Sequence, residues 1–229
     1  MNRRTLLHTL ALLALPTPTS AGLNQSPVIV LGDSITKGVR PGVKPDETFA
    51  ALLAEALRRR GITGEVRNVG IGGERTDQAL VRLDRDVLAL RPRVVTVMYG
   101  TNDSYVDRGA RMSRISVDQY RENLVRLVTR LRKGGAQPVL MTPPRWARDA
   151  APNGLGENPN VPLEPYVQAC REVAREQRVP LVDHFEGWTR ANSRGVDLRD
   201  WTTDGCHPNP RGHQELAARL IPSVVAALR

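Results

Sequence analysis

Short apolar runs alternate with longer amphipathic segments along most of the 229-residue chain, and this alternation constrains the fold more than any other feature. Four of the runs have the length and composition of a strand that is buried on both faces of a parallel sheet, and the run 65–69 is a short strand with polar residues. The runs cover residues 28–31, 65–69, 94–98, 138–141 and 179–182. The segments between them carry apolar residues at helical spacing. This pattern predicts an α/β fold in which helices cover both faces of a five-stranded parallel sheet.

Five of the intervening segments are predicted to be helices, and two stretches are not. The predicted helices cover residues 47–60, 76–90, 116–133, 163–177 and 209–228. Residues 142–162 are rich in Pro, Gly and Asn, and a loop of that length inside a compact domain is expected to have a functional role. We expect residues 183–203 to be irregular, apart from a short helical piece near Trp188.

The first 21 residues differ from the rest of the chain. Two arginines precede a mostly apolar segment over residues 5–15, and small residues lead up to Ala21. This order is typical of a secretory signal peptide, and the apolar part is too short to span a bilayer as an ordinary helix. We therefore expect residues 1–21 to direct export to the periplasm or the exterior and residues 22–229 to form one domain. The alternative is a helix that stays attached.

The charge pattern argues against a nucleic-acid partner. The formal net charge is +9, but the basic residues are nearly all arginines scattered beside Asp and Glu along the predicted helices. Such scattering indicates a solvated basic surface and contains no nucleic-acid motif. We expect a monomer that binds no nucleic acid and has no stable membrane insertion once the signal peptide is removed.

Glycines and polar residues follow three of the predicted strands and precede the last helix. The four turns are Gly32-Asp33-Ser34, Gly72-Gly73-Glu74, Gly100-Thr101-Asn102-Asp103 and Asp204-Gly205-Cys206-His207-Pro208. The carboxyl ends of parallel strands meet at one edge of the sheet, where open α/β sheets bind their ligands. We therefore expect Ser34, Gly73, Asn102, Asp204 and His207 to converge at that edge.

These five residues have the chemistry that acyl transfer requires. A serine hydroxyl becomes an effective nucleophile when a base takes its proton, and His207, with an ordinary pKa of about 6.5, can be that base for Ser34. Asp204 is close enough in sequence to orient the ring. The backbone N–H groups of Ser34 and Gly73 and the side-chain amide of Asn102 are candidate donors to a tetrahedral intermediate.

Taken together and in this order, the four blocks resemble those of the SGNH, or GDSL, hydrolase family. The resemblance implies a flavodoxin-like three-layer α/β/α sandwich and a serine esterase without a metal or another cofactor. It implies that Ser34 is the nucleophile, His207 the base and Asp204 its orienting partner, with Ser34, Gly73 and Asn102 as the oxyanion hole. The chain departs from the family pattern at Cys206, where an aliphatic residue is expected, and this departure does not touch the chemistry.

Cysteine and histidine residues leave other interpretations open. Asp204, Cys206, His207 and His213 include the side chains of a metal site, although their spacing matches none of the usual zinc patterns. In an exported protein Cys206 can also pair with Cys170, but we expect both to be small buried side chains.

The substrate is less constrained than the reaction. Residues 142–162 and the residues after Ser34 include few large apolar side chains. We therefore expect short acyl groups, above all acetyl, on a carbohydrate or another polar carrier. Core packing is the commoner role for Trp146, Trp188 and Trp201, and they would stack on sugar rings only if they are exposed at the edge of the site. The alternatives are lipase-like or thioesterase activity on longer chains and, outside the enzymes, a carbohydrate-binding module, against which the complete catalytic set argues.

Overall fold

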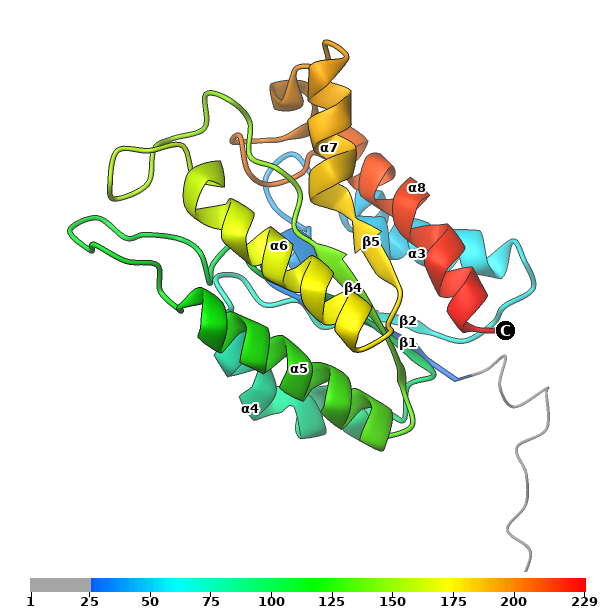
Figure 1. The fold of residues 1–229 in the computed structure, drawn as a ribbon. Helices are drawn as coiled ribbons and strands as arrows, with labels where there is room; N and C mark the ends of the chain where they lie inside the picture. The colour runs from blue at the N-terminus through cyan, green and yellow to red at the C-terminus, as the bar shows by residue number, and fades with distance from the viewer. Residues whose placement is uncertain (1–25) are drawn as a thin grey trace, which may run out of the picture.

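One parallel sheet of five strands forms the centre of the molecule (Figure 1). The computed structural model describes residues 26–229, so the predicted signal peptide lies outside the described residues. The strands are β1 (Val28–Gly32), β2 (Val66–Asn68), β3 (Val94–Met98), β4 (Gln137–Thr142) and β5 (Leu181–Asp183). Their order, β2-β1-β3-β4-β5, is that of flavodoxin-like sheets. All five predicted strands are confirmed, with small shifts at their ends.

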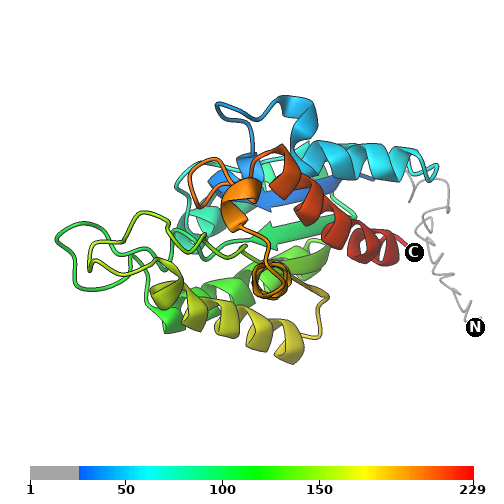
Figure 2. The same ribbon diagram turned by 90° about the horizontal axis from the view of Figure 1, so that it is seen from above.

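Helices cover both faces of this sheet, as Figures 1 and 2 show from two directions. One layer consists of α4 (Thr76–Asp86), α5 (Val117–Lys133) and α6 (Asn160–Glu176). The other layer contains α3 (Phe49–Arg58) and α8 (Pro210–Ala227), and α7 (His184–Ser193) follows β5 directly. The four-residue helix α2 (Ser34–Lys37) follows β1. The three-layer α/β/α prediction is therefore confirmed.

Strand side chains alternate between two buried layers because successive Cβ atoms point to opposite faces of a sheet. Ile29 and Leu31 of β1 belong to the core cluster that includes α4, α5 and α6, whereas Val28 and Val30 belong to the cluster that includes α3 and α8. All four side chains are fully buried. Burial on both faces explains why β1, β3 and β4 appear in the sequence as largely apolar runs, whereas the edge strand β2 is partly exposed and contains Arg67 and Asn68.

Two helical segments differ from the sequence-based prediction. Helix α6 begins at Asn160, inside the predicted loop, and the stretch 183–203 contains the whole of α7. The side chain of Asp183, the last residue of β5, accepts a 3.0 Å hydrogen bond from the Glu186 N–H and thereby caps α7. Gly187 and several polar residues weaken the apolar periodicity of α7, so pattern alone does not identify this helix.

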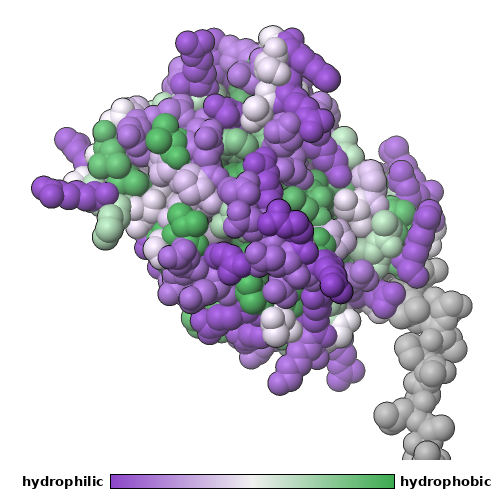
Figure 3. All heavy atoms as spheres, in the orientation of Figure 1, coloured by the Kyte–Doolittle hydropathy of each residue, from purple (hydrophilic) through white to green (hydrophobic). Residues whose placement is uncertain are grey.

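The exterior is largely polar. Figure 3 shows hydrophilic side chains over most of the face drawn, with apolar residues scattered between them. Within residues 26–229, no helix combines the length and the apolar character needed to cross a membrane. Cys170 and Cys206 are both buried and form no disulfide in the described part of the chain, in agreement with the preferred prediction.

Candidate active site

Ser34 begins helix α2, directly beyond the carboxyl end of β1, and its side chain is half-buried. The turn before it is tight, because a Cβ atom added to Gly32 would lie 2.1 Å from Thr36 Oγ1. Asp33 caps the helix by accepting a 2.9 Å hydrogen bond from the Ile35 N–H. The strand, turn and helix together fix Ser34 at the edge of the sheet where open α/β folds bind ligands.

His207 and Asp204 form a hydrogen-bonded line with Ser34. His207 Nε2 is 2.9 Å from Ser34 Oγ, and His207 Nδ1 is 2.8 Å from Asp204 Oδ2. The other carboxylate oxygen, Asp204 Oδ1, accepts backbone N–H bonds from Cys206 at 3.1 Å and from His207 at 2.8 Å. A ring whose Nδ1–H donates to the carboxylate presents an unprotonated Nε2 to the serine hydroxyl. The structure thus brings together the three residues that the sequence predicts as nucleophile, base and orienting acid.

The surroundings favour an ionised Asp204 and a neutral His207. Partial burial acts to raise the pKa of Asp204, but hydrogen bonds from the backbone and the ring of His207 outweigh it and lower this pKa to about 2. Burial lowers the pKa of His207 below its ordinary value, and the opposing effect of Asp204 does not cancel that change. At neutral pH the ring can therefore accept a proton, as a general base must.

The turn that contains Gly73 lies beside Ser34. A Cβ atom added to the neighbouring Gly72 would be 4.0 Å from Ser34 Cβ. A 3.3 Å hydrogen bond from the Glu74 N–H to the Ile71 carbonyl closes the turn, and Gly73 has a φ of 76°, a left-handed conformation that favours glycine. The Ser34 N–H, at the first position of α2, has no acceptor within its own helix. Both N–H groups are thus candidate donors to an oxyanion formed at Ser34.

The side-chain amide of Asn102 is oriented by two neighbours. Asn102 Nδ2 donates to Asp33 Oδ2 at 3.3 Å, and Asn102 Oδ1 accepts from Arg114 Nη1 at 3.2 Å. Because only an amide oxygen can accept from a guanidinium, Arg114 directs the NH2 group of Asn102 toward the Ser34 turn. Arg114 is itself held by a two-point ion pair with Asp107, with contacts of 2.6 and 2.8 Å.

The turns that carry Ser34 and Asn102 each contain a buried carboxyl group, Asp33 in the first and Asp103 in the second. Burial raises the pKa of Asp33 to about 7 and the pKa of Asp103 to about 6, although hydrogen bonds oppose the effect of burial in both. Asp103 Oδ1 accepts hydrogen bonds from the Thr76 N–H at 2.9 Å and from the Thr76 hydroxyl at 2.5 Å. The turn that carries Asn102 is therefore tied to the start of α4.

Three charged side chains that were not predicted from the sequence as site residues contact the predicted ones. Arg40 contacts Asp204, whereas Arg114 and Asp33 contact Asn102. Asp33 could have been identified from the sequence as a site residue, because it directly precedes Ser34 in the nucleophile turn. The two arginines carry no such signal, because nothing in their spacing distinguishes them from the many surface arginines.

Two of the three tryptophans pack in the core, so they do not meet the condition for stacking on sugar rings. Trp188 and Trp201 are 0% and 4% exposed, and their rings pack edge to face with centroids 5.2 Å apart. Trp146 is half-buried and stacks on Tyr105 at a centroid distance of 6.2 Å. The loop that contains Trp146 packs against the His207 turn, since the Ala147 N–H donates to the Gly205 carbonyl at 2.7 Å.

The residues of the alternative metal site do not gather around one point. His213 is buried, and its Nδ1 accepts a 3.2 Å hydrogen bond from the Phe49 N–H, whereas the His207 ring lies between Ser34 and Asp204. Across residues 26–229, no three His, Cys, Asp or Glu side chains are arranged to hold a metal ion.

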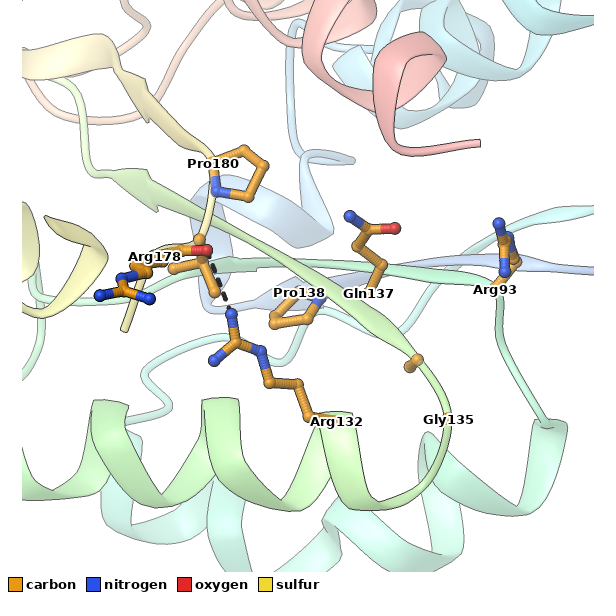
Figure 4. Close-up of a pocket in the computed structure, with 9 residues that line it drawn as sticks. Arg93, Arg132, Gly135, Gln137, Pro138, Arg178 and Pro180 are labelled. Atoms are coloured by element: carbon orange, nitrogen blue, oxygen red, sulfur yellow. Dashed lines mark hydrogen bonds between the residues drawn. The ribbon is translucent and has the colours of Figure 1, made fainter. Parts of the chain in front are cut away.

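A cavity of about 250 Å³, drawn in Figure 4, lies at the amino ends of the strands, whereas Ser34 follows the carboxyl end of β1. It is lined by residues that precede β3, β4 and β5, including Arg93, Arg132 and Arg178. Arg132 Nη2 donates to the Arg178 carbonyl at 3.1 Å, which is the dashed contact in Figure 4. Because this cavity adjoins the amino ends of the strands, it is separate from the candidate active site.

Comparisons with known proteins agree with this geometry. The chain is 28% identical over 198 residues to the uncharacterized lipoprotein YqeF of Bacillus subtilis, covering 80% of each chain. It is 29% identical over 209 residues to the isoamyl acetate-hydrolyzing esterase 1 homolog of Rattus norvegicus, covering 85% of this chain and 80% of that protein. The solved structure of an acetyl xylan esterase, AlAXEase, superimposes with a TM-score of 0.72 at 25% identity, covering 86% of this chain and 99% of that one.

The family match covers most of the described residues and all four turns of the site. The description of the matching family is GDSL-like Lipase/Acylhydrolase family, and the match extends over residues 30–215, from β1 into α8. It therefore includes Ser34, Gly73, Asn102, Asp204 and His207. The chain belongs to the GDSL-like lipase/acylhydrolase family.

Proposed function

We propose that Ser34, His207 and Asp204 hydrolyse carboxylic esters through an acyl-enzyme, and that the preferred acyl group is short, above all acetyl, on a carbohydrate or another polar carrier. The observation that carries the proposal is the line from Ser34 Oγ to His207 Nε2 and from His207 Nδ1 to Asp204 Oδ2, with contacts of 2.9 and 2.8 Å. This arrangement can activate a serine hydroxyl without any group from outside the chain.

In the first half-reaction, His207 Nε2 takes the hydroxyl proton while Ser34 Oγ attacks the carbonyl carbon of the ester. The carbonyl oxygen becomes an oxyanion, to which the N–H groups of Ser34 and Gly73 and the Asn102 amide donate hydrogen bonds. Asp204 stabilises the protonated ring. The ring then gives its proton to the leaving alkoxide, the alcohol departs, and an ester of Ser34 remains.

In the second half-reaction, water takes the place of the alcohol. His207 removes a proton from the water as its oxygen attacks the acyl carbon of the Ser34 ester, and the same donors receive the second oxyanion. Collapse of this intermediate breaks the bond to Ser34 Oγ, which takes back the proton from the ring. The acid is released and the starting state is restored.

The acyl preference is supported by the surroundings of Ser34 and by two relatives. Val39 follows the nucleophile helix in sequence, and the Ile71 N–H donates to the Gly32 carbonyl at 3.0 Å; these side chains are 46% and 45% exposed and offer only a small apolar surface. The rat relative is named as a homolog of an isoamyl acetate-hydrolyzing esterase, and AlAXEase is described as an acetyl xylan esterase, so both names refer to acetyl esters. A longer apolar chain would require more apolar surface than these two side chains supply.

We also propose that residues 1–21 act as a signal peptide, which leaves residues 22–229 as one catalytic domain that works in the periplasm or outside the cell. The order of basic, apolar and small residues supports this proposal. Amino-terminal sequencing of the protein recovered from the periplasm and the medium of expressing cells tests it. A mature chain that still begins at Met1 would refute it.

The experiment that tests the catalytic proposal compares wild type with Ser34→Ala on nitrophenyl acetate and on acetylated glycans. The variant should lose on the order of 10⁴- to 10⁶-fold in kcat while its circular dichroism spectrum is unchanged. A serine-directed phosphonate should label Ser34 of the wild type. A variant that keeps a tenth of the activity excludes Ser34 as nucleophile.

Two other outcomes would favour the alternatives. Inhibition by EDTA that zinc reverses would favour the metal site, and glycan binding without turnover would favour a binding module.

A further inference from the structure

Arg40 reaches the candidate triad from the segment that follows the nucleophile helix. A pair of backbone contacts between Arg40 and Val43 closes this segment, with the Val43 N–H donating to the Arg40 carbonyl at 2.9 Å. Arg40 Nη2 is 2.8 Å from Asp204 Oδ2, and the side chains of Arg40 and Asp204 are 27% and 40% exposed. The contact therefore joins the segment after α2 to the last of the four turns.

Asp204 Oδ2 accepts hydrogen bonds from both Arg40 and His207 Nδ1. One carboxylate oxygen therefore contacts a guanidinium and a ring that becomes a cation when it is protonated. The other oxygen is occupied by the backbone N–H groups of Cys206 and His207. A carboxylate held at both oxygens cannot rotate about its terminal bond without breaking one of these contacts. Arg40 thus adds a further contact, at the same oxygen as the ring, to a carboxylate that the ring and two backbone N–H groups already orient.

We propose that Arg40 is a positioning residue that acts through Asp204 and sets the lower pH limit at which His207 serves as a base. The proposal rests on the proposed function of His207. Arg40 lowers the pKa of His207 in two ways. It shares the negative charge of Asp204 Oδ2 with the ring, and its own positive charge opposes protonation of the ring.

Few other charges act on His207, which isolates the effect of Arg40. Asp204 and Arg40 are the charged groups that shift the pKa of His207, and Arg40 shifts it downward after the larger effect of burial. Arg199 pairs with Asp149 at 3.1 Å and with Asp197 at 2.5 Å, and none of these three side chains is among the charged groups that shift the pKa of His207. Asp33, in the Ser34 turn, is fully buried, and its carboxyl group accepts hydrogen bonds from the Ile35 N–H and the Asn102 side chain.

Removal of the Arg40 charge should therefore make the ring easier to protonate. In Arg40→Gln, the acidic limb of the kcat/KM profile should move to higher pH by roughly half to one unit, a modest shift because the ion pair is partly exposed. Arg40→Met, which keeps the apolar stem, should give the same shift. Arg40→Lys, which keeps the charge, should leave the limb within about 0.3 unit of wild type.

The matched control is Arg199→Gln, which removes an arginine from a neighbouring ion pair that does not include Asp204. Its acidic limb should coincide with that of wild type. If Arg40 has only a structural role, the neutral variants will lower the plateau of the profile and leave the limb in place. An unmoved limb in both Arg40→Gln and Arg40→Met would overturn the proposal.

A measurement that needs no turnover separates this proposal from the catalytic one. NMR titration of the histidine resonances in Ser34→Ala, with and without Arg40→Gln, should show one ring whose pKa rises in the double variant. Loss of that resonance in His207→Gln assigns it. An unchanged titration refutes the role of Arg40 even if the esterase proposal holds. A shifted titration supports the role of Arg40 even if the wild type hydrolyses no ester.

Discussion

Tyr99 donates a 2.6 Å hydrogen bond from its hydroxyl to Glu74 Oε2, and this bond joins two of the turns that surround Ser34. Tyr99 directly precedes the turn that carries Asn102, and Glu74 directly follows Gly73. Both bonded side chains are buried. The bond therefore ties together the two turns that supply candidate oxyanion donors from outside helix α2.

Tyr99→Phe should weaken both the fold and the catalytic step. Glu74 is a buried carboxylate that also accepts from Arg82 Nε at 2.6 Å, and loss of one hydrogen bond to a charged group costs about 1.5–3 kcal/mol. Displacement of the oxyanion donors should lower kcat by roughly tenfold and leave KM nearly unchanged. Urea unfolding measures the first effect, and steady-state hydrolysis of nitrophenyl acetate measures the second.

Tyr166→Phe is the matched control for this variant. Tyr166 donates from its hydroxyl to the Ile115 carbonyl, a contact that includes neither Glu74 nor Asn102. The control should lose stability without a comparable loss in kcat. If Tyr99→Phe also keeps the kcat of wild type, the Tyr99–Glu74 bond stabilises the fold but does not position the donors.

Asn102→Ala should lower kcat far more than it changes KM. The amide is proposed to bind an oxyanion that exists only in the transition state and the tetrahedral intermediate, and removal of one such donor costs roughly 10²- to 10³-fold in kcat. Kinetics over a range of nitrophenyl acetate concentrations distinguish the two constants. A variant with a raised KM and the kcat of wild type would identify Asn102 as a contact to the bound substrate instead.

Residues whose chemistry is tied to a local pattern could be predicted from the sequence. The apolar run before Gly32 identifies β1, and the turn after it identifies Ser34 as a residue at the edge of the sheet. Arg40 could not be predicted, because its contact with Asp204 joins residues 164 positions apart and a surface arginine has no local signature. The burial of Trp188 likewise depends on tertiary packing, since no local pattern separates a core tryptophan from one that lines a site.

His184 should make the stability of the protein depend on pH. Burial lowers its pKa to about 3, the Arg219 charge adds to this effect, and neither ring nitrogen has a hydrogen-bond partner among residues 26–229. In the unfolded chain the ring takes up a proton below about pH 6.5. Between pH 6.5 and 3 the unfolded state therefore binds more protons, and the stabilising contribution of the neutral ring is lost as the pH falls.

The test compares wild type with His184→Leu in urea at pH 7, 6 and 5. The free energy of unfolding of wild type, minus that of the variant, should fall by about 2 kcal/mol between pH 7 and pH 5. The raised pKa values of Asp33 and Asp103 act in the opposite direction over this range, but they are common to both proteins and cancel in the difference. A difference that is independent of pH would show that the folded protein takes up the proton as readily as the unfolded chain.

The last prediction concerns the length of the acyl chain. Val39 and Ile71 are the exposed large apolar residues in the segments that flank Ser34, and the other residues of the turn 37–40 are basic or glycine. Each methylene group that an apolar groove buries contributes about 0.8 kcal/mol, or nearly fourfold in binding. Two exposed side chains can cover a few methylene groups at most. We therefore expect kcat/KM to be highest for acetyl to butyryl nitrophenyl esters and to fall by the octanoyl ester.

Ile71→Ala should lower the ratio of butyryl to acetyl activity by roughly twofold to fourfold, the contribution of about one buried methylene group. Val81→Ala is the matched control, because Val81 is 86% exposed on helix α4 and lies outside the four turns of the site. It should leave the ratio unchanged. A preference for decanoyl over acetyl esters, measured below the micelle-forming concentration, would instead establish the lipase-like alternative, because only an extended apolar groove can convert added methylene groups into faster hydrolysis.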